Sequence, residues 1–226
     1  MKNMKRILVT LVAAVLLMAV TVAGTLAWLQ DQTETVTNTF EIGNVSISLK
    51  EGTVYQPDEK GVTTKPNGEL VDDADLGQHI SENGATRNEE GVGNAYKLMP
   101  GKTYDKDPKI YVSDTSEDCW LFVKVVNGIA DIEANTIVGQ MNNNSWTLVA
   151  GTTDVYSYAT VVSAGAEIPV FETFTLTDNA DIENYVTADN AEAIISIQAY
   201  AIQAEEIETI EEAWTAAGAQ WPDLID

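Results

Sequence analysis

The chain has 226 residues and a strongly acidic composition, with 35 Asp and Glu against 12 Lys and Arg and a formal net charge of -23. A surface of this charge repels phosphate backbones, which argues against nucleic acid as a partner. Cys119 is the only cysteine, so an intrachain disulfide is excluded, and the single histidine, His79, cannot furnish the usual two-histidine zinc site. The length suits one domain rather than two separate cores.

The N-terminal residues 1–27 have the order of a secretory signal peptide. Basic residues come first, an uncharged apolar run follows, and small residues lead up to Ala27. This order predicts cleavage between Ala27 and Trp28, and it predicts that a single domain over 28–226 is secreted. An uncleaved membrane anchor is the alternative, because the uncharged run is long enough to span a bilayer. The basic residues of the leader are Lys2, Lys5 and Arg6, and their removal changes the net charge from -23 to -26.

Residues 40–49 alternate between apolar and polar side chains, but the phase of the alternation changes at Gly43-Asn44. The apolar residues before the change are Phe40 and Ile42, and those after it are Val45, Ile47 and Leu49. A shift of one residue turns every later side chain to the opposite face of a sheet. The pattern therefore predicts two strand segments joined by a bulge or a bend.

Residues 51–95 are rich in Gly, Asp, Glu, Asn and Pro, which predicts a polar loop insertion in the domain. Pro66-Asn67-Gly68 predicts a hairpin within it, and His79 is expected to be solvated. No cofactor or structural metal is predicted. Acidic residues of the insertion could in principle hold Ca²⁺, but their spacing does not match an EF-hand loop, and acidic residues in polar loops are usually solvated. These acidic residues are Asp72, Asp73, Asp75, Glu89 and Glu90.

The second half of the chain is typical of a β-rich domain. Residues 120–126 are apolar on nearly both faces, which predicts a buried central strand with Cys119 packed in or near the core. Short strands at near-regular spacing predict an all-β domain of β-sandwich or jelly-roll type. Apolar residues at helical spacing then predict a short C-terminal amphipathic helix over 205–217, stopped by Gly218. The further predicted strands cover residues 146–149, 155–162, 168–176 and 194–202.

Three parts of the sequence resemble proteins that are processed by the SipW-type signal peptidase of Gram-positive bacteria, the TasA-like and camelysin-like family. The matching segments are residues 23–31, 33–40 and 43–45, then 98–102, 106–108, 110–112 and 116–125, and finally the run AIQAEEIETIEEAW. The resemblance implies a secreted structural protein of the biofilm matrix that forms fibres with copies of itself or with related matrix subunits. It also implies that a SipW-type peptidase removes the leader, and that mature subunits join by donating an N-terminal strand to the open sheet of a neighbour.

The residues of the N-terminal segment are compatible with strand donation. The Thr- and Val-rich residues 33–40 become a free end only after the leader is removed. They can extend a neighbour's sheet by backbone hydrogen bonds, with Val36, Phe40 and Ile42 in the grooves of that neighbour. The alternative is that the same segment pairs within its own domain.

Two other functions remain open at this point. A camelysin-like surface metallopeptidase is the first, but the chain has no His-Glu-x-x-His motif. A monomeric cell-surface adhesin or binding module is the second. No residues are arranged as a nucleophile with a base, so neither a catalytic residue nor an enzymatic activity is predicted.

Overall fold

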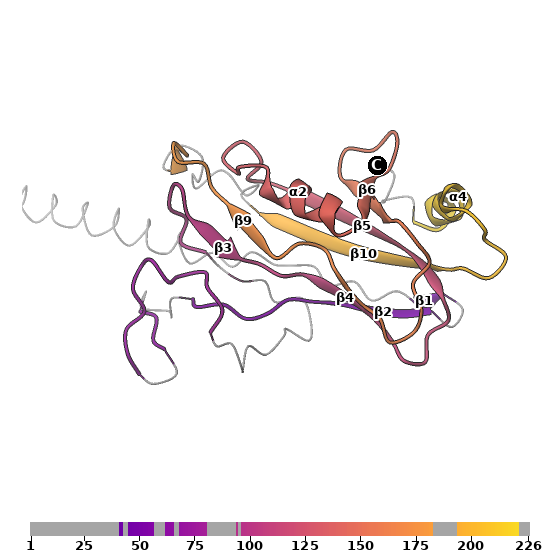
Figure 1. The fold of residues 1–226 in the computed structure, drawn as a ribbon, viewed down its shortest axis with the longest axis horizontal. Helices are drawn as coiled ribbons and strands as arrows, with labels where there is room; N and C mark the ends of the chain where they lie inside the picture. Colours follow the sequence, from indigo (N-terminus) through magenta and orange to yellow (C-terminus); the bar gives the residue numbers. More distant parts are fainter. Residues whose placement is uncertain are drawn as a thin grey trace, which may run out of the picture.

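The computed structural model describes residues 41–42, 45–56, 62–65, 68–80, 94, 96–182 and 194–221. Within these residues the chain forms antiparallel sheets together with two short helices, so the predicted all-β class is confirmed (Figure 1). The helices are α2, Thr136–Asn143, and α4, Ile210–Gln220. In this described part of the chain, no helix combines the length and the apolar character that crossing a bilayer would require.

The strands form two four-stranded sheets and one two-stranded ladder. The first sheet has the order β1-β2-β4-β8, with bounds Glu41–Ile42, Val45–Lys50, Lys109–Val112 and Glu167–Pro169. The second sheet has the order β10-β5-β7-β6, with bounds Ile195–Gln203, Cys119–Asn127, Val155–Tyr158 and Trp146–Leu148. The ladder pairs β3, Thr103–Asp105, with β9, Thr173–Thr175.

One apolar cluster is shared by the two four-stranded sheets. The alternating burial along β2 follows from its period-two pattern, because every second side chain turns away from solvent. The first sheet contributes residues such as Ile47 and Ile110, and the second contributes Leu121, Val123 and Ile197, all at most 2% exposed. The inner faces of the two sheets therefore bury a single common core.

The predicted central strand is confirmed as β5. It pairs with β10 on one side and with β7 on the other, and the two long strands β5 and β10 run side by side (Figure 1). Its first residue, Cys119, is completely buried, as the sequence predicted. Burial, together with the negative charge of Asp118, raises the pKa of the Cys119 thiol to about 12, so the group stays protonated and unreactive at ordinary pH.

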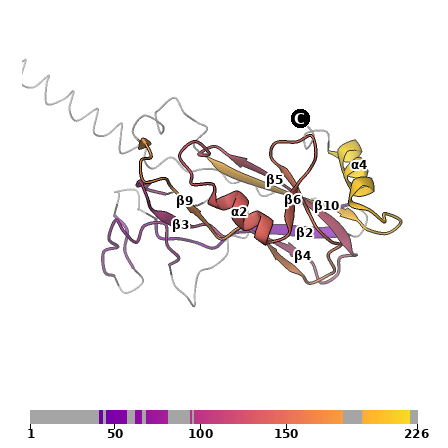
Figure 2. The same cartoon turned by 45° about the horizontal axis from the view of Figure 1, so that its top comes forward.

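The C-terminal helix exists, but its predicted bounds are wrong. α4 begins at Ile210, because Thr209 caps it in a reciprocal hydrogen-bonding pair with Glu212. The predicted first residues lie outside the helix, and Glu206 there has a left-handed φ of 63°. The helix also continues through the expected stop at Gly218. Its apolar face covers the outer surface of the second sheet at one end of β10, where Trp214 packs against Phe122 at a ring-centroid distance of 5.4 Å (Figure 1, Figure 2).

Two predicted strand regions have different outcomes in the structure. The two segments predicted within 40–49 exist as β1 and β2, and they pair antiparallel with Ile42 opposite Val45. The predicted bulge or bend at Gly43-Asn44 lies outside the described residues. The predicted strand over 168–176 is divided between β8, which pairs with β4, and β9, which pairs with β3. Helix α2, which the sequence did not predict, lies between β6 and β9 and buries Ile137 and Met141 one turn apart (Figure 2).

The described parts of the predicted insertion lie against the body of the domain. Val54 and Leu76 are buried, and an isolated bridge joins Val54 to His79. The predicted hairpin is confirmed by the bridge between Thr64 and Leu70, whose chain reversal includes Gly68 at a φ of 83°. The insertion therefore contributes buried contacts as well as a polar surface.

Candidate functional site

Most of the predicted site residues lie outside the described residues. This holds for both cleavage-site residues, Ala27 and Trp28, and for the donor residues Val36 and Phe40. Ile42 belongs to β1, where its backbone faces Val45 of its own chain. Strand β1 also lies against β10 of the second sheet.

Strand β10 forms one end of the second sheet and has unusual composition for an edge. Its nine residues, ISIQAYAIQ, contain neither a charged residue nor a proline, and all nine pair with β5. Within the described residues, no strand pairs with the other side of β10. The other strands at sheet ends are much shorter: β1 has two residues, β6 has three, and β8 has three, including Pro169.

The hydrogen-bond parity of the β5–β10 ladder identifies the backbone groups at the outer edge. Gly128 N donates to the carbonyl of Ile194 at 2.8 Å, and Ala204 N donates to the carbonyl of Asp118 at 2.8 Å. In an antiparallel ladder such paired residues alternate with residues whose backbone groups point away. The even-numbered residues of β10 therefore direct their backbone N–H and C=O groups to β5. The residues that direct N–H and C=O groups to the outer edge are Ile195, Ile197, Ala199, Ala201 and Gln203.

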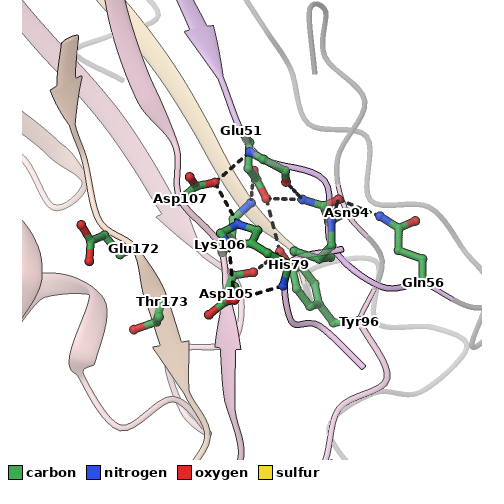
Figure 3. A network of polar contacts seen from close by, with 12 residues as sticks. Glu51, Gln56, His79, Asn94, Tyr96, Asp105, Lys106, Asp107, Glu172 and Thr173 are labelled. Atoms are coloured by element: carbon green, nitrogen blue, oxygen red, sulfur yellow. Dashed lines mark hydrogen bonds and ion pairs between the residues drawn. The ribbon is translucent and has the colours of Figure 1, made fainter. Parts of the chain in front are cut away.

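A second candidate site is a buried group of polar side chains, the Glu51 cluster, which consists of Glu51, Asn94, Tyr96 and Lys106 (Figure 3). Glu51 occupies its centre. Its Oε2 lies 2.7 Å from Lys106 Nζ, and its Oε1 accepts a hydrogen bond from Asn94 Nδ2 at 2.7 Å. The Tyr96 hydroxyl lies 3.3 Å from the same Oε1 and donates to the Asp105 carbonyl at 2.9 Å. The two oxygens of one carboxylate thus hold an amine and an amide.

The Glu51 cluster is shielded from water. Glu51, Asn94 and Lys106 are 5%, 2% and 3% exposed. A buried ion pair persists only when its geometry and its further hydrogen bonds offset the cost of desolvation, and here each polar atom of Glu51 has a partner. Burial, reinforced by the charge of Glu51, raises the pKa of Tyr96 well above its ordinary value, so its hydroxyl remains a donor.

His79 lies beside the Glu51 cluster, and its side chain is 33% exposed, so the predicted solvated position is only partly confirmed. Its Nδ1 is 3.4 Å from Asp105 Oδ2, and its Nε2 is 3.6 Å from Asp107 Oδ1. Asp107 Oδ1 also accepts a hydrogen bond from the backbone N–H of Gly52 at 2.7 Å. His79 Nε2 is buried without a hydrogen-bond partner among the described residues. The imidazole therefore occupies a fixed position between two carboxylates.

The acidic residues considered for Ca²⁺ are not gathered around a common point. Asp75 pairs with Lys65 at 3.4 Å, and Asp73 pairs with Lys97 at 2.8 Å, so lysines already balance two of these carboxylates. Glu89 and Glu90 lie outside the described residues. Among the residues that are described, no group of three or more His, Cys, Asp or Glu side chains is arranged to hold a metal ion.

Sequence reasoning did not find the Glu51 cluster. Glu51 and Lys106 are 55 positions apart, and no local pattern marks either residue as buried. Comparison with protein-family models, curated proteins and solved structures finds no match for this chain. Its function therefore has to be argued from the geometry of the β10 edge and the Glu51 cluster.

Proposed function

We propose that this chain is a secreted structural subunit that joins copies of itself into surface or matrix fibres by addition of a β-strand. The observation that carries the proposal is the outer edge of β10, a nine-residue strand with no charge and no proline. Natural sheets usually protect long edges with charges, prolines or bulges, because unpaired backbone groups are a template for another strand. An added strand would pair with the outward N–H and C=O groups of β10.

The architecture that we infer is a β-sandwich. Its support is the single core that both four-stranded sheets share. In a sandwich, side chains of the two inner faces form the core, while the outermost strands leave backbone groups at the rim. The β10 edge is such a rim, and its odd-numbered side chains, including Ile197 and Ala199, are already buried in the core. Assembly at this edge would therefore rest on backbone pairing.

The proposed donor is the segment of residues 33–40 from a neighbouring copy, with the following β1 residues. Val36, Phe40 and Ile42 are all even-numbered, so in an extended strand they share one face. Export followed by cleavage between Ala27 and Trp28 by a SipW-type signal peptidase would free the donor. This part of the proposal rests on the sequence resemblance to TasA-like fibre proteins.

The charge of the exported protein sets a condition for assembly. A subunit with a net charge of -26 repels its copies. Salt screens that repulsion, with a Debye length of about 10 Å at 0.1 M, whereas short-range backbone hydrogen bonds are little affected. Fibre formation is therefore expected to increase with salt.

The main experiment compares two proteins, one that begins at Trp28 and one that begins at Glu41. Both should give the same circular dichroism spectrum of a folded β-domain, but only the longer protein should give fibres in electron micrographs and growing particles in light scattering. Unchanged fibres from the shorter protein would rule out donation by residues 33–40. A longer protein that stays monomeric at every salt concentration would favour a monomeric adhesin instead.

A matched pair of charge variants tests the edge itself. Ser196→Glu places a carboxylate on β10, and Thr147→Glu places the same charge on β6, at the opposite edge of the same sheet. We expect Ser196→Glu to slow fibre growth at low salt at least tenfold, while Thr147→Glu behaves like the unmodified protein. Equal inhibition by both variants would mean that net charge, and not the β10 edge, controls assembly.

A further inference from the structure

The Glu51 cluster brings together the three groups that a spontaneous amide cross-link needs: an amine, a carboxamide and a carboxyl group that contacts both. The amine is Lys106 Nζ, the carboxamide is Asn94, and the carboxylate of Glu51 lies 2.7 Å from Lys106 Nζ and 2.7 Å from Asn94 Nδ2 (Figure 3). We propose that Lys106 and Asn94 form an intramolecular isopeptide bond, with Glu51 as the group that transfers protons. The Glu51 cluster takes no part in the proposed strand addition, so the two proposals are independent.

Glu51 can convert Lys106 into a nucleophile. An ammonium ion does not attack a carbonyl carbon, because its nitrogen has no free electron pair. The attack therefore requires that Lys106 first transfers a proton to a base within hydrogen-bond distance. Lys106 is 3% exposed and its Nζ donates directly to Glu51 Oε2, so the proton has an acceptor within hydrogen-bond distance.

Asn94 is held as the electrophile. Its Oδ1 accepts a hydrogen bond from Gln56 Nε2 at 2.7 Å and a longer one from the backbone N–H of Val54 at 3.4 Å. When an amine adds to the amide carbon, negative charge develops on this oxygen, and fixed donors stabilise that charge. The leaving nitrogen, Nδ2, is held by Glu51 Oε1 at 2.7 Å and by the Gly52 carbonyl at 2.8 Å.

The proposed reaction balances without an oxidant or a cofactor. A bond forms between Lys106 Nζ and Asn94 Cγ, the bond between Cγ and Nδ2 breaks, and ammonia leaves. Of the three protons on the lysine ammonium, one stays on the new amide nitrogen, one converts the leaving group to ammonia, and one remains on Glu51. Glu51 thus accepts protons from the attacking nitrogen and donates one to the leaving nitrogen.

Aromatic side chains form an apolar wall beside the reacting groups. The Tyr96 ring lies edge-on to Phe174 at a centroid distance of 5.1 Å and to Tyr104 at 5.7 Å. Tyr104 and Phe174 stack at 5.0 Å, and neither is more than 1% exposed. Exclusion of water strengthens the electrostatic interactions of Glu51 and removes the competing nucleophile that would hydrolyse the amide.

The bond would connect the end of the insertion to the segment between β3 and β4. Asn94 is the last described residue of the insertion, and Lys106 lies just after β3, so the link closes a short loop of the chain. Such a cross-link restricts the unfolded chain in the way that a disulfide does. It would give a covalent tie to a chain whose only cysteine cannot form an intrachain disulfide.

Intact-mass spectrometry of the purified, folded protein is the deciding experiment. We expect a mass lower than that of the sequence by one ammonia molecule, and a proteolytic digest that contains a branched peptide joining Lys106 to Asn94. Succinimide formation at the three Asn-Gly pairs, 67–68, 83–84 and 127–128, would also release ammonia, but fragment ions would place that loss at the asparagine concerned. A folded protein of full mass, or a loss located anywhere except at the Lys106–Asn94 pair, would overturn the proposal.

Variants separate the roles of the three groups. Lys106→Arg and Glu51→Gln should retain the full mass, whereas the control Lys102→Arg, at a lysine that donates to backbone carbonyls outside the cluster, should keep the deficit. Asn94→Asp should lose the mass of water instead of ammonia, because the leaving group changes with the side chain. If Lys106→Arg or Glu51→Gln does not fold, two other measurements still test the proposal. They are the branched peptide of the unmodified protein and the loss of water, instead of ammonia, from Asn94→Asp. An unchanged deficit in folded Lys106→Arg would contradict the inference.

Discussion

The outer edge of β10 and the Glu51 cluster differ in where their polar groups find partners. At the edge, backbone N–H and C=O groups point away from β5, and no described strand receives them. In the Glu51 cluster, polar side chains from distant parts of the chain satisfy one another out of contact with water. The edge is suited to recognition of another chain, whereas the cluster is suited to stability and to chemistry within one chain, because water competes at the first and not at the second.

The largest effect on folding is expected from Lys106→Met. Before any cross-link forms, Lys106 is the cation beside buried Glu51, so this change breaks a buried pair at a cost of about 3–5 kcal/mol. In the cross-linked protein it removes the covalent tie as well. The control is Lys97→Met, which breaks an exposed pair with Asp73 and should cost no more than about 1 kcal/mol. Urea unfolding measures both values. Similar losses for the two variants would mean that the Glu51 cluster does not stabilise the fold as its burial indicates.

The inner face of β10 should be nearly as sensitive. Ile197 is completely buried in the core that the two sheets share, so Ile197→Ala should lower the free energy of unfolding by about 2–5 kcal/mol. The neighbouring Gln198→Ala, on the half-buried outer face, provides the control and should have a smaller effect. A small loss at Ile197 would show that the common core at β10 is loosely packed.

Cys119 provides a chemical test of the same buried region. Because its pKa is raised to about 12, the thiol should react with iodoacetamide at pH 8 far more slowly in the native protein than in urea. The raised pKa also means that the unfolded thiol ionises first, so this residue should reduce stability as the pH rises above 9, where the unfolded group begins to lose its proton. Rapid alkylation of the native protein would contradict the burial of β5 at this end.

The smallest effect on folding is expected at the edge itself. Ser196→Glu should change the free energy of unfolding by no more than about 0.5 kcal/mol, because Ser196 lies on the half-buried outer face of the sheet, away from the shared core. The same variant is expected to slow assembly, so the two measurements separate recognition from stability. A large loss of stability would mean that this face of β10 is packed and not available to a partner.

The sequence predicted the elements whose patterns are local. A long apolar run identified β5, the regular spacing of short strands identified β10, and Pro66-Asn67-Gly68 identified a hairpin that the bridge between Thr64 and Leu70 confirms. The helix at the C-terminus was also found, but its start was not, because the Thr209–Glu212 cap outweighs the helical spacing of the residues before it. Helix α2 was missed, since its buried pair, Ile137 and Met141, is too short a pattern to stand out.

By itself, the amino-acid sequence determined the all-β class, the acidic surface and the burial of Cys119. Alternation and apolar runs are patterns of neighbouring residues, and composition can be counted without knowing the fold. Only the tertiary structure decided that β10 ends its sheet, and that Glu51, Asn94 and Lys106 meet in one buried site. Both results depend on which distant segments pack together. The packing of these segments is determined by the total apolar area that the core buries, and no short stretch of sequence specifies it.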